Sequence, residues 1–367
     1  MILKTVRTVC FRNLADAETE TGEKNIFLVG QNGQGKTNFL EAVYYASYAS
    51  SFRGVRDSDI ARIGEKDFSA SVKTAEAACT SVLVKFEEGK KTVFIDGKKS
   101  LDRKDLPELV PCIIFCHEDM EFVSGSPERR RWFFDQSLSL YDPVYLEDFR
   151  RYRRVLRSRN TLLREAFVHE RESMLRTLDL QLVSCGLRLM EKREGAVKLF
   201  SQIFEPLYEE VTGIDGISIR YASSWKEKDE DALAAFLLGK REAELAAGVS
   251  LSGPHRDRYT FVRNHATEFA GNASTGQRRL LALLLRIAQA RRFSDMTGKR
   301  PVLLLDDVLL EMDGEKRWKF LSVMPDYDQA FFTFLPEESY EDYKRPGTLV
   351  YRVNGGVLFP GTTRGKT

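Results

Sequence analysis

A glycine-rich segment near the N-terminus carries the residue types that bind phosphate. It consists of Gly30, Gln31, Asn32, Gly33, Gln34, Gly35, Lys36 and Thr37, which fit the pattern G-x-x-x-x-G-K-[ST] without a mismatch. Glycines let such a loop curl so that its backbone N–H groups point at a phosphate. Lys36 is then expected to bridge the β- and γ-phosphates of a nucleoside triphosphate, and the Thr37 hydroxyl to bind Mg²⁺. We therefore predict a site for ATP with Mg²⁺.

The flanking residues distinguish a phosphate loop from a glycine-rich turn between any strand and helix. Residues 25–29 form a short apolar run that ends at a glycine, and residues 37–49 carry apolar side chains at helical spacing. A strand before the loop and a helix after it suit phosphate binding, because the helix N-terminus adds partial positive charge. The context therefore favours the phosphate loop over the plain turn.

Two acidic residues far along the chain are expected to complete the metal site. Asp306 and Asp307 follow four apolar residues, 302–305, so Asp306 should emerge at the C-terminal edge of a buried strand, beside the phosphate loop. We expect Asp306 to hold Mg²⁺, directly or through water, and Asp307 to orient or deprotonate the attacking water. With Lys36, these are the predicted catalytic residues. The alternative is a strand that ends in a solvated pair of aspartates.

These residues need a sheet to position them, and strand patterns occur on both sides of a long helical region. Strand character is found at residues 3–11, 25–29, 69–73, 81–86, 92–95 and 110–115, which predict a mixed sheet around the helix at 37–49. Helical spacing follows at about 126–207 and 230–247, with a small strand at 217–221. Later strands are expected at 258–262, 301–306, 330–334 and 347–353, and a helix at 275–292.

The predicted fold class is α/β, with one domain interrupted by another. Residues 1–120 and 248–367 are expected to form the α/β domain, and residues 121–247 a mostly helical insert. A chain of 367 residues agrees with about two domains, since one hydrophobic core rarely serves so many.

Composition indicates a cytoplasmic protein without a membrane segment. Apolar residues make up 43% and charged residues 30% of the chain, and no run approaches the roughly 18 apolar residues of a membrane helix. The N-terminus carries charges too early for a secretory signal. The odd number of cysteines favours reduced thiols over a disulfide framework. These are Cys10, Cys79, Cys112, Cys116 and Cys185.

A second helix N-terminus carries residues that suit an anion. Ser274, Thr275, Gly276 and Gln277 open the predicted helix at 275–292, about 25 residues before the Asp306 strand. A serine cap and a glycine at a helix N-terminus can bind an anion. The segment resembles the S-x-G-Q signature of ABC-type ATPases, in which each of two heads contacts the ATP bound by the other. The alternative is an ordinary capped helix.

Further segments across nearly the whole chain resemble the RecF family of bacterial recombination mediators, which is related to the heads of SMC proteins. They are Phe11-Arg12-Asn13, Ser51-Phe52-Arg53-Gly54-Val55-Arg56-Asp57, Gly125-Ser126-Pro127-Glu128-Arg129-Arg130-Arg131 and Ser252-Gly253-Pro254-His255-Arg256-Asp257. The resemblance implies an ABC/SMC-type P-loop ATPase head, in which Arg12 and Asn13 contact ATP. One departure is that Thr333 leads into Phe334-Leu335, without the histidine that ABC transporters have near this position. This departure is compatible with slow ATP turnover.

The resemblance also implies what such a protein does. It would bind DNA in an ATP-dependent manner, dimerise head to head, and hydrolyse ATP slowly as a weak DNA-stimulated ATPase. It would act with RecO and RecR to load RecA at single-strand gaps and stalled forks. The expected DNA is double-stranded or a junction of single and double strands, bound without sequence specificity.

An arginine-rich stretch is the candidate DNA surface. Residues 126–160 contain nine arginines, no lysine and five acidic residues, a net charge of +4. Arg150, Arg153, Arg154 and Arg157 share one helical face, while Phe149, Tyr152, Val155 and Leu156 should face the core. Contacts of arginine with phosphate give affinity without specificity. The alternative is a solvated stripe, partly paired with Glu147 and Asp148. Arg129, Arg130 and Arg131 suit either DNA or domain packing.

Three other classes of protein are disfavoured. An ABC-type energy subunit of a transporter is disfavoured by the arginine-rich insert and by the extent of the resemblance. A phosphotransferase such as a small-molecule kinase would have no need of residues 274–277. A true SMC head is disfavoured because an insert of about 120 residues, at 1.5 Å of rise per residue, cannot form the arm of hundreds of residues that an SMC protein has.

Overall fold

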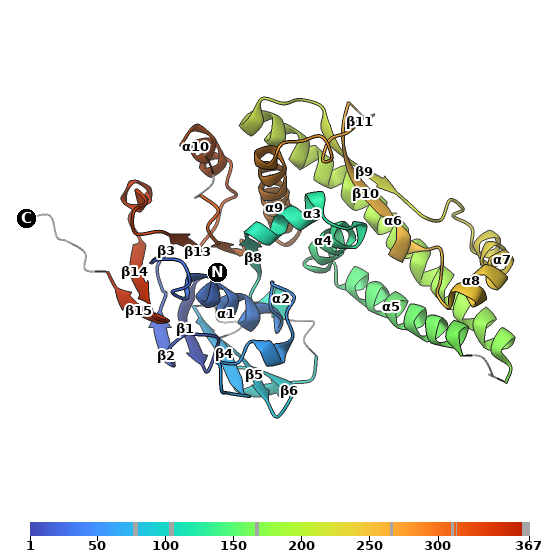
Figure 1. The fold of residues 1–367 in the computed structure, drawn as a ribbon, viewed down its shortest axis with the longest axis horizontal. Coiled ribbons are helices and arrows are strands. Elements are labelled where there is room, and N and C mark those ends of the chain that lie inside the picture. The colour runs from blue at the N-terminus through green and yellow to red at the C-terminus, as the bar shows by residue number, and fades with distance from the viewer. Residues whose placement is uncertain are drawn as a thin grey trace, which may run out of the picture. The chain divides into compact units, whose positions relative to one another are not determined.

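The residues around the phosphate loop belong to a parallel sheet in the computed structural model, which describes residues 1–75, 80–102, 106–165, 169–264, 267–309, 312 and 314–361. The strand order is β15-β14-β3-β13-β12-β8, and Figure 1 labels each of these strands except β12. All neighbours are parallel except β14 and β15. The strands are β3 (Asn25–Val29), β8 (Cys112–Phe115), β12 (Val302–Leu305), β13 (Ala330–Phe334), β14 (Thr348–Asn354) and β15 (Val357–Pro360). Every residue of β3, β8, β12 and β13 is buried, as expected for a parallel sheet covered on both faces.

A second sheet, wholly antiparallel, takes up the other strands of the first hundred residues. Its order is β2-β1-β4-β5-β6-β7. The strands are β1 (Leu3–Val9), β2 (Ala17–Glu20), β4 (Phe68–Thr74), β5 (Ser81–Glu87), β6 (Lys90–Ile95) and β7 (Lys98–Ser100). Asp96 and Gly97 form the turn between β6 and β7 with φ of 49° and 76°, as the sequence predicted. The prediction of one mixed sheet was wrong, because local alternation does not say which strands pair.

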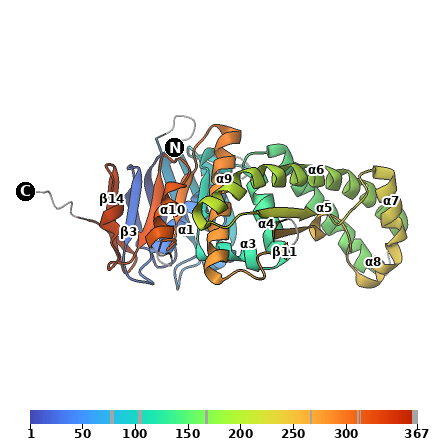
Figure 2. The ribbon, with the colours of Figure 1, turned by 90° about the horizontal axis from the view of Figure 1, so that it is seen from above.

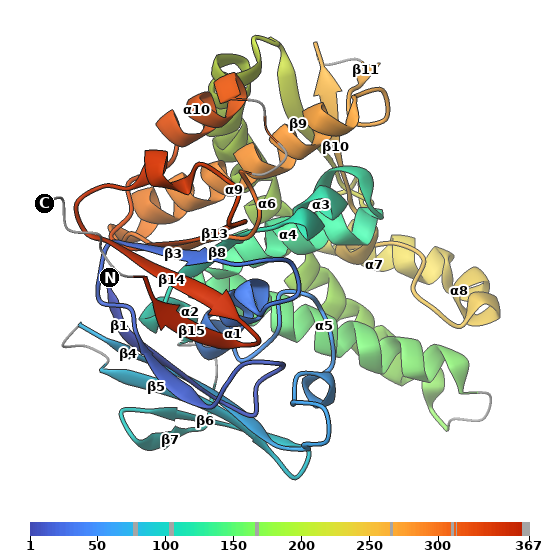
Figure 3. The same cartoon turned by 60° about the vertical axis from the view of Figure 1, so that its left-hand side comes forward.

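Helix α1 (Lys36–Tyr48) lies between these two sheets (Figure 3), and ten of its thirteen residues are buried. Its apolar residues share one core with β1, β4 and β5 of the antiparallel sheet and with β3, β8 and β12 of the parallel sheet. The short helices α2 (Leu106–Leu109) and α10 (Gly314–Ser322) belong to the same part of the chain. Because both sheets hold α1, the loop at its N-terminus has a rigid support.

The chain divides into two compact units, one of Met1–Asp119 with Gln289–Thr367 and the other of Met120–Ala288. Helix α9 (Thr275–Thr297) contains the second junction. The predicted domain limits at 121 and 247 stay a prediction. The division into two compact units instead places the later boundary after Ala288.

None of the described helices combines the length and apolar character of a membrane span. Four of the cysteines carry free thiols, and Cys79 lies outside the described residues.

The second unit is built on two long helices, α5 (Pro143–Arg164) and α6 (Arg171–Thr212), which run alongside each other (Figure 2). A three-stranded sheet, β11-β10-β9, packs against α6 through β9. The remaining elements are α3 (Glu121–Ser124), α4 (Pro127–Ser139), β9 (Ile217–Ala222), α7 (Glu230–Gly239), α8 (Arg241–Ala247), β10 (Arg258–Arg263) and β11 (Thr267–Glu268). The helix predicted over 230–247 is interrupted after Gly239, a poor helix former, where the N–H of Lys240 bonds the carbonyl of Leu237.

Buried arginines hold α5 and α6 to the rest of the second unit. Arg193 pairs with Asp135 and with Asp257, each at 2.8 Å. Arg159 pairs with Asp179 at 2.7 Å and with Glu244 at 2.6 Å, and its side chain is fully buried. Because Arg159 is enclosed, the arginine-rich stretch of the sequence overstates the positive charge that this unit presents to solvent.

Candidate nucleotide site

The segment Gly30–Thr37 forms a tight loop between β3 and α1. Gly33 and Gly35 have φ of 78° and 114°, which favours glycine at both positions. A side chain at Gly30 would meet the carbonyl oxygen of Val353, 2.4 Å from its Cβ. Helix α1 begins at Lys36 without a side-chain cap, so its first N–H groups can serve a phosphate.

The loop borders an open pocket of about 300 Å³. Its lining residues are Gln31, Asn32, Gly33, Gly35, Lys36, Thr37, Asn38, Arg53 and Asp307. The ammonium of Lys36 donates to the carbonyl of Gly30 at 2.6 Å and to that of Gln31 at 3.3 Å, so the cation is held within the loop. Two cationic side chains, Lys36 and Arg53, make this pocket suitable for a polyanion.

Asp306 lies where the sequence predicted, directly after β12 and beside the loop. The hydroxyl of Thr37 donates to its Oδ1 at 2.9 Å. The carboxyl is nearly buried, and burial first and the neighbouring charge of Asp307 second raise its pKa to about 7. The hydrogen bond from Thr37 and the charge of Arg53 lower the pKa and offset part of this rise. A buried carboxylate of this kind would be stabilised by a nearby divalent cation.

The oxygen atoms of Thr37 and Asp306 fit Mg²⁺, which prefers hard oxygen ligands. No group of three or more His, Cys, Asp or Glu that could hold a metal occurs among the described residues. This is compatible with Mg²⁺ bound to a nucleotide, because such an ion commonly takes one or two protein ligands and fills its shell with phosphate oxygens and water.

Asp307 lines the pocket, and a neighbouring threonine holds it. Its backbone has φ of 51°, and its N–H donates to Oγ1 of Thr333 at 2.7 Å. The Thr333 hydroxyl lies 2.8 Å from Oδ1 of Asp307. The sequence singled out Thr333 only for the absent histidine that follows it. Thr333 lies one residue before the end of a predicted strand, which places it near the edge of the sheet where Asp306 and Asp307 emerge. Only the strand order shows that this strand lies next to the strand before Asp306.

Arg53 and Asn38 are further pocket residues that sequence reasoning did not single out. A guanidinium nitrogen of Arg53 donates to Oδ1 of Asn38 at 3.1 Å and lies 3.4 Å from a carboxylate oxygen of buried Glu41. Arg53 belongs to one of the segments that resemble the RecF family, which could have marked it. Asn38 follows the loop directly and carried no separate signal.

Arg12 and Asn13 lie next to the loop but are not among the residues that line the pocket. Arg12 forms a two-pronged pair with Glu41, at 3.0 and 2.9 Å. The side chain of Asn13 donates to the carbonyl of Gly33 at 3.1 Å. These bonds support the phosphate loop from the side. Direct contact of Arg12 and Asn13 with ATP stays a prediction.

The turn between β14 and β15 also supports the loop. The N–H of Gly356 donates to the carbonyl of Gln34 at 2.9 Å, and that of Gly355 to the side-chain oxygen of Gln34 at 2.7 Å. A Cβ on Gly356 would lie 1.8 Å from the carbonyl oxygen of Asn13. The C-terminal hairpin therefore contacts both the phosphate loop and the Arg12–Asn13 segment.

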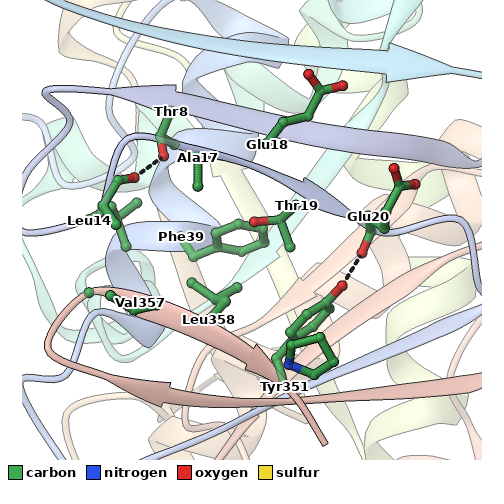
Figure 4. A pocket seen from close by; sticks show the side chains of 13 residues that line it. Thr8, Leu14, Ala17, Glu18, Thr19, Glu20, Phe39, Tyr351, Val357 and Leu358 are labelled. Carbon is green, nitrogen blue, oxygen red and sulfur yellow. Dashed lines mark hydrogen bonds between the residues drawn. The ribbon is translucent and has the colours of Figure 1, made fainter.

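A second pocket, of about 220 Å³, lies between β1–β2 and β14–β15 (Figure 4). Phe39 and Leu358 give it an apolar interior, and Thr8 and Tyr351 bond backbone carbonyls. Its lining residues include Glu18 and Glu20 and no lysine or arginine. This pocket is therefore less suited to a phosphate than the pocket beside the loop, which is lined by Lys36 and Arg53.

In the second unit, Ser274–Gln277 form a reciprocal cap at the start of α9. The N–H of Ser274 donates to Oε1 of Gln277 at 2.8 Å, and the N–H of Gln277 to Oγ of Ser274 at 3.3 Å. Ser274, Thr275 and Gly276 are exposed. An ordinary capped helix and a signature that contacts a second chain both suit this geometry, and the contact in trans stays a prediction.

The arginine stripe lies on the exposed face of α5. Arg150, Arg153, Arg154 and Arg157 are all exposed, and the expected inward residues Phe149, Tyr152, Val155 and Leu156 are buried or half-buried against the core. Asp148 accepts hydrogen bonds from Arg188 on α6. The alternative of a solvated stripe partly paired with Glu147 and Asp148 stays open. Arg154 and Arg157 form no salt bridge with any described residue.

Arg130 and Arg131 serve packing inside the second unit. Arg130 donates to the carbonyl of Tyr259 at 3.1 Å, and Arg131 to that of Asp257 at 2.8 Å. Both guanidinium groups are about half-buried, and burial lowers their pKa. Arg129 is exposed. Of the two predicted roles, DNA contact and domain packing, Arg130 and Arg131 have the packing role.

Comparison with known proteins identifies the family. The family model described as "RecF/RecN/SMC N terminal domain" matches residues 2–355. The chain is 41% identical to the DNA replication and repair protein RecF of Treponema pallidum over 349 residues, which cover 95% of this chain and 98% of that protein. The chain belongs to the RecF family. RecF of Bacillus subtilis is 30% identical over 375 residues, 98% of this chain and all of that protein.

Solved structures agree with this membership. One described as the recombination mediator protein RecF-ATP in the RecFOR pathway has a TM-score of 0.89 and 26% identity, over 98% of both chains. An Smc head domain derived from Pyrococcus furiosus has a TM-score of 0.53 at 13% identity, which is a likeness of fold alone. This RecF-family chain therefore has the ATPase head fold that RecF and SMC proteins share, with a mostly helical second part, as the sequence predicted.

Proposed function

We propose that this RecF-family protein is an ATP-dependent DNA-binding protein of recombinational DNA repair and replication-fork maintenance, acting in the cytoplasm. The observation that carries the proposal is the contact of Thr37 with Asp306, which joins a phosphate loop to a buried carboxylate at the edge of one pocket. The similar solved structure of RecF with ATP, which is described as a recombination mediator protein, supports the same proposal.

The residues of the loop would bind and hydrolyse ATP as follows. Backbone N–H groups of residues 30–37 and the ammonium of Lys36 bind the phosphates. Thr37 and Asp306 hold Mg²⁺, which when bound neutralises charge on the phosphate chain. Asp307 orients a water molecule and accepts its proton as the water oxygen bonds to the γ-phosphorus. The bond from that phosphorus to the β–γ bridging oxygen breaks, and ADP and phosphate leave.

A second copy of the chain would complete the site. Ser274–Gln277 are the proposed trans contact with the γ-phosphate, because an exposed helix N-terminus with a serine cap and a glycine can bind an anion. ATP would then hold a head-to-head homodimer together until it is hydrolysed. We expect hydrolysis to be slow and to be stimulated weakly by DNA.

The exposed arginines of α5 are the proposed DNA surface. Arg150, Arg153, Arg154 and Arg157 would contact phosphates of double-stranded DNA or of a junction of single and double strands. Such contacts carry no sequence preference. Bound at a gap, the dimer would help RecO and RecR to load RecA. The alternative of a transporter energy subunit is not favoured, since the relatives named above are DNA replication and repair proteins.

The test is DNA affinity as a function of salt, measured with and without ATP and Mg²⁺. We expect ATP to tighten DNA binding of the unchanged protein by about 5-fold or more, a usual size for coupling between two sites. In Lys36→Ala, which should lose nucleotide binding, ATP should have no effect on DNA affinity. Unchanged protein that binds DNA equally well with and without ATP would contradict the proposal.

A further inference from the structure

One hydroxyl, that of Thr333, joins the two acidic residues of the nucleotide site. The parallel register pairs Leu305 of β12 with Phe332 of β13, so Thr333 lies level with Asp306. Its Oγ1 is 2.8 Å from Oδ1 of Asp307 and 3.4 Å from Oδ1 of Asp306. The side chain is 3% exposed, so bulk water does not compete for this hydroxyl.

The same hydroxyl holds the backbone of Asp307. Asp307 has φ of 51°, in the left-handed region that residues other than glycine rarely adopt. Its N–H donates to Oγ1 of Thr333 at 2.7 Å. Since the oxygen accepts this bond, its single hydrogen is left for a carboxylate, and the shorter distance directs it to Asp307. Thr333 thus restrains both the main chain and the carboxylate of Asp307.

We propose that Thr333 is a positioning residue for ATP hydrolysis, which aims the carboxylate of Asp307 at the attacking water. This inference rests on the proposed role of Asp307. The following residue, Phe334, has no polar side-chain atom that could take over the task. A misplaced base slows the chemical step and leaves the binding of phosphates by Lys36 and the loop intact.

Two variants separate the hydroxyl from the shape of the side chain. Thr333→Val keeps the branched shape and loses the hydroxyl, whereas Thr333→Ser keeps the hydroxyl and loses a methyl group. The measurements are kcat and KM for ATP, affinity for a non-hydrolysable ATP analogue, and the lifetime of the ATP-bound dimer by sedimentation. For Thr333→Val we expect kcat to fall by about 10-fold or more, affinity to stay within about 2-fold, and the dimer to last longer.

Thr333→Ser should restore kcat to within about 3-fold of the unchanged protein. The inference is overturned if Thr333→Val turns over ATP normally, if Thr333→Ser is as slow as Thr333→Val, or if analogue affinity falls together with kcat. Thermal unfolding checks that each variant is folded. If Thr333→Val unfolds at the assay temperature, Thr333→Ala at a lower temperature takes its place and should show the same separation of kcat from affinity.

Asp307→Asn distinguishes failure of this inference from failure of the proposed function. If Asp307→Asn abolishes turnover and Thr333→Val does not change it, only the role of Thr333 is wrong. If Asp307→Asn turns over ATP as fast as the unchanged protein, the proposed role of Asp307 is wrong, and the inference fails with it.

Discussion

The hydroxyl of Thr37 donates a hydrogen bond of 2.9 Å to Oδ1 of Asp306, although 269 residues separate the two in the chain. Thr37 lies in the first turn of α1, and Asp306 directly follows β12. Parallel pairing of β3 with β13 and of β13 with β12 brings the ends of these strands to one edge. The contact brings together two oxygen atoms that suit Mg²⁺, one from the Thr37 hydroxyl and one from the Asp306 carboxylate. Burial is the main cause that raises the pKa of Asp306 to about 7.

The C-terminal hairpin should control nucleotide binding through Gly356. Gly356 has φ of 81°, and an added Cβ would lie 1.8 Å from the carbonyl oxygen of Asn13. Gly356→Ala must therefore move Asn13, which supports Gly33 of the loop. We expect a loss of stability of about 2–3 kcal/mol and ATP affinity lower by about 10-fold, measured by thermal unfolding and nucleotide titration.

Gly355 supplies a matched control. It also has positive φ, 54°, but nothing lies within 4 Å of its added Cβ. Gly355→Ala should cost about 1–2 kcal/mol of stability and leave ATP affinity nearly unchanged. Equal effects of the two variants on ATP affinity would show that the contact with Asn13 does not matter.

Ser274→Arg should bind ATP normally and fail to dimerise with it. A bulky cation at the exposed start of α9 would obstruct a second chain, while the phosphate loop in the other unit is unchanged. Sedimentation with ATP and Mg²⁺ measures the dimer. Ser126→Arg is the control, because Ser126 caps α4 in the same way. Loss of either serine cap should reduce the stability of the protein by a similar amount, about 1 kcal/mol. Normal dimers of Ser274→Arg would rule out the trans contact.

Removing Arg154 and Arg157 should weaken DNA binding in a salt-dependent way. If each contacts one phosphate, the double variant Arg154→Ala, Arg157→Ala should reduce the slope of log affinity against log salt by about 2. The control is the double variant Arg176→Ala, Lys198→Ala on α6. It removes the same amount of charge, from side chains that are 69% and 73% exposed. Equal weakening by this control would point to net charge rather than to the α5 stripe.

Acid should destabilise the protein through His255. Its Nε2 lies 3.1 Å from the carbonyl of Ser250 and must carry the hydrogen, so Nδ1 accepts from the hydroxyl of Tyr152 at 2.7 Å. Burial is the main cause that lowers the pKa of His255 from 6.5 to about 4. The unfolded chain therefore binds more protons than the folded chain between these values, and stability falls as pH falls through this window.

The loss of stability should reach about 3 kcal/mol by pH 4, as judged from the size of the pKa shift. Denaturation by urea at pH 7, 5.5 and about 4 measures it. His255→Gln cannot titrate in this range, so its stability should depend less steeply on pH. If the slopes of the two proteins coincide, His255 is not the group responsible.

Some features were predictable because they depend on residues close together in the chain. The phosphate loop at 30–37, the cap at 274–277 and the buried face of α5 each need only the spacing of a few residues to be recognised. The turn at Asp96 and Gly97 is equally local. The position of Asp306 could be predicted as well, since a buried parallel strand carries the residue after it to a known edge of the sheet.

Local sequence patterns therefore predict a loop for phosphate and an acidic pair for metal and water, and they indicate a family that the comparisons confirm. Only the folded chain shows that the early strands divide between two sheets, that Thr333 holds Asp307, and that Arg130 and Arg131 donate to backbone carbonyls. Strand pairing and burial depend on contacts between distant segments, so the spacing of neighbouring residues carries no signal for them.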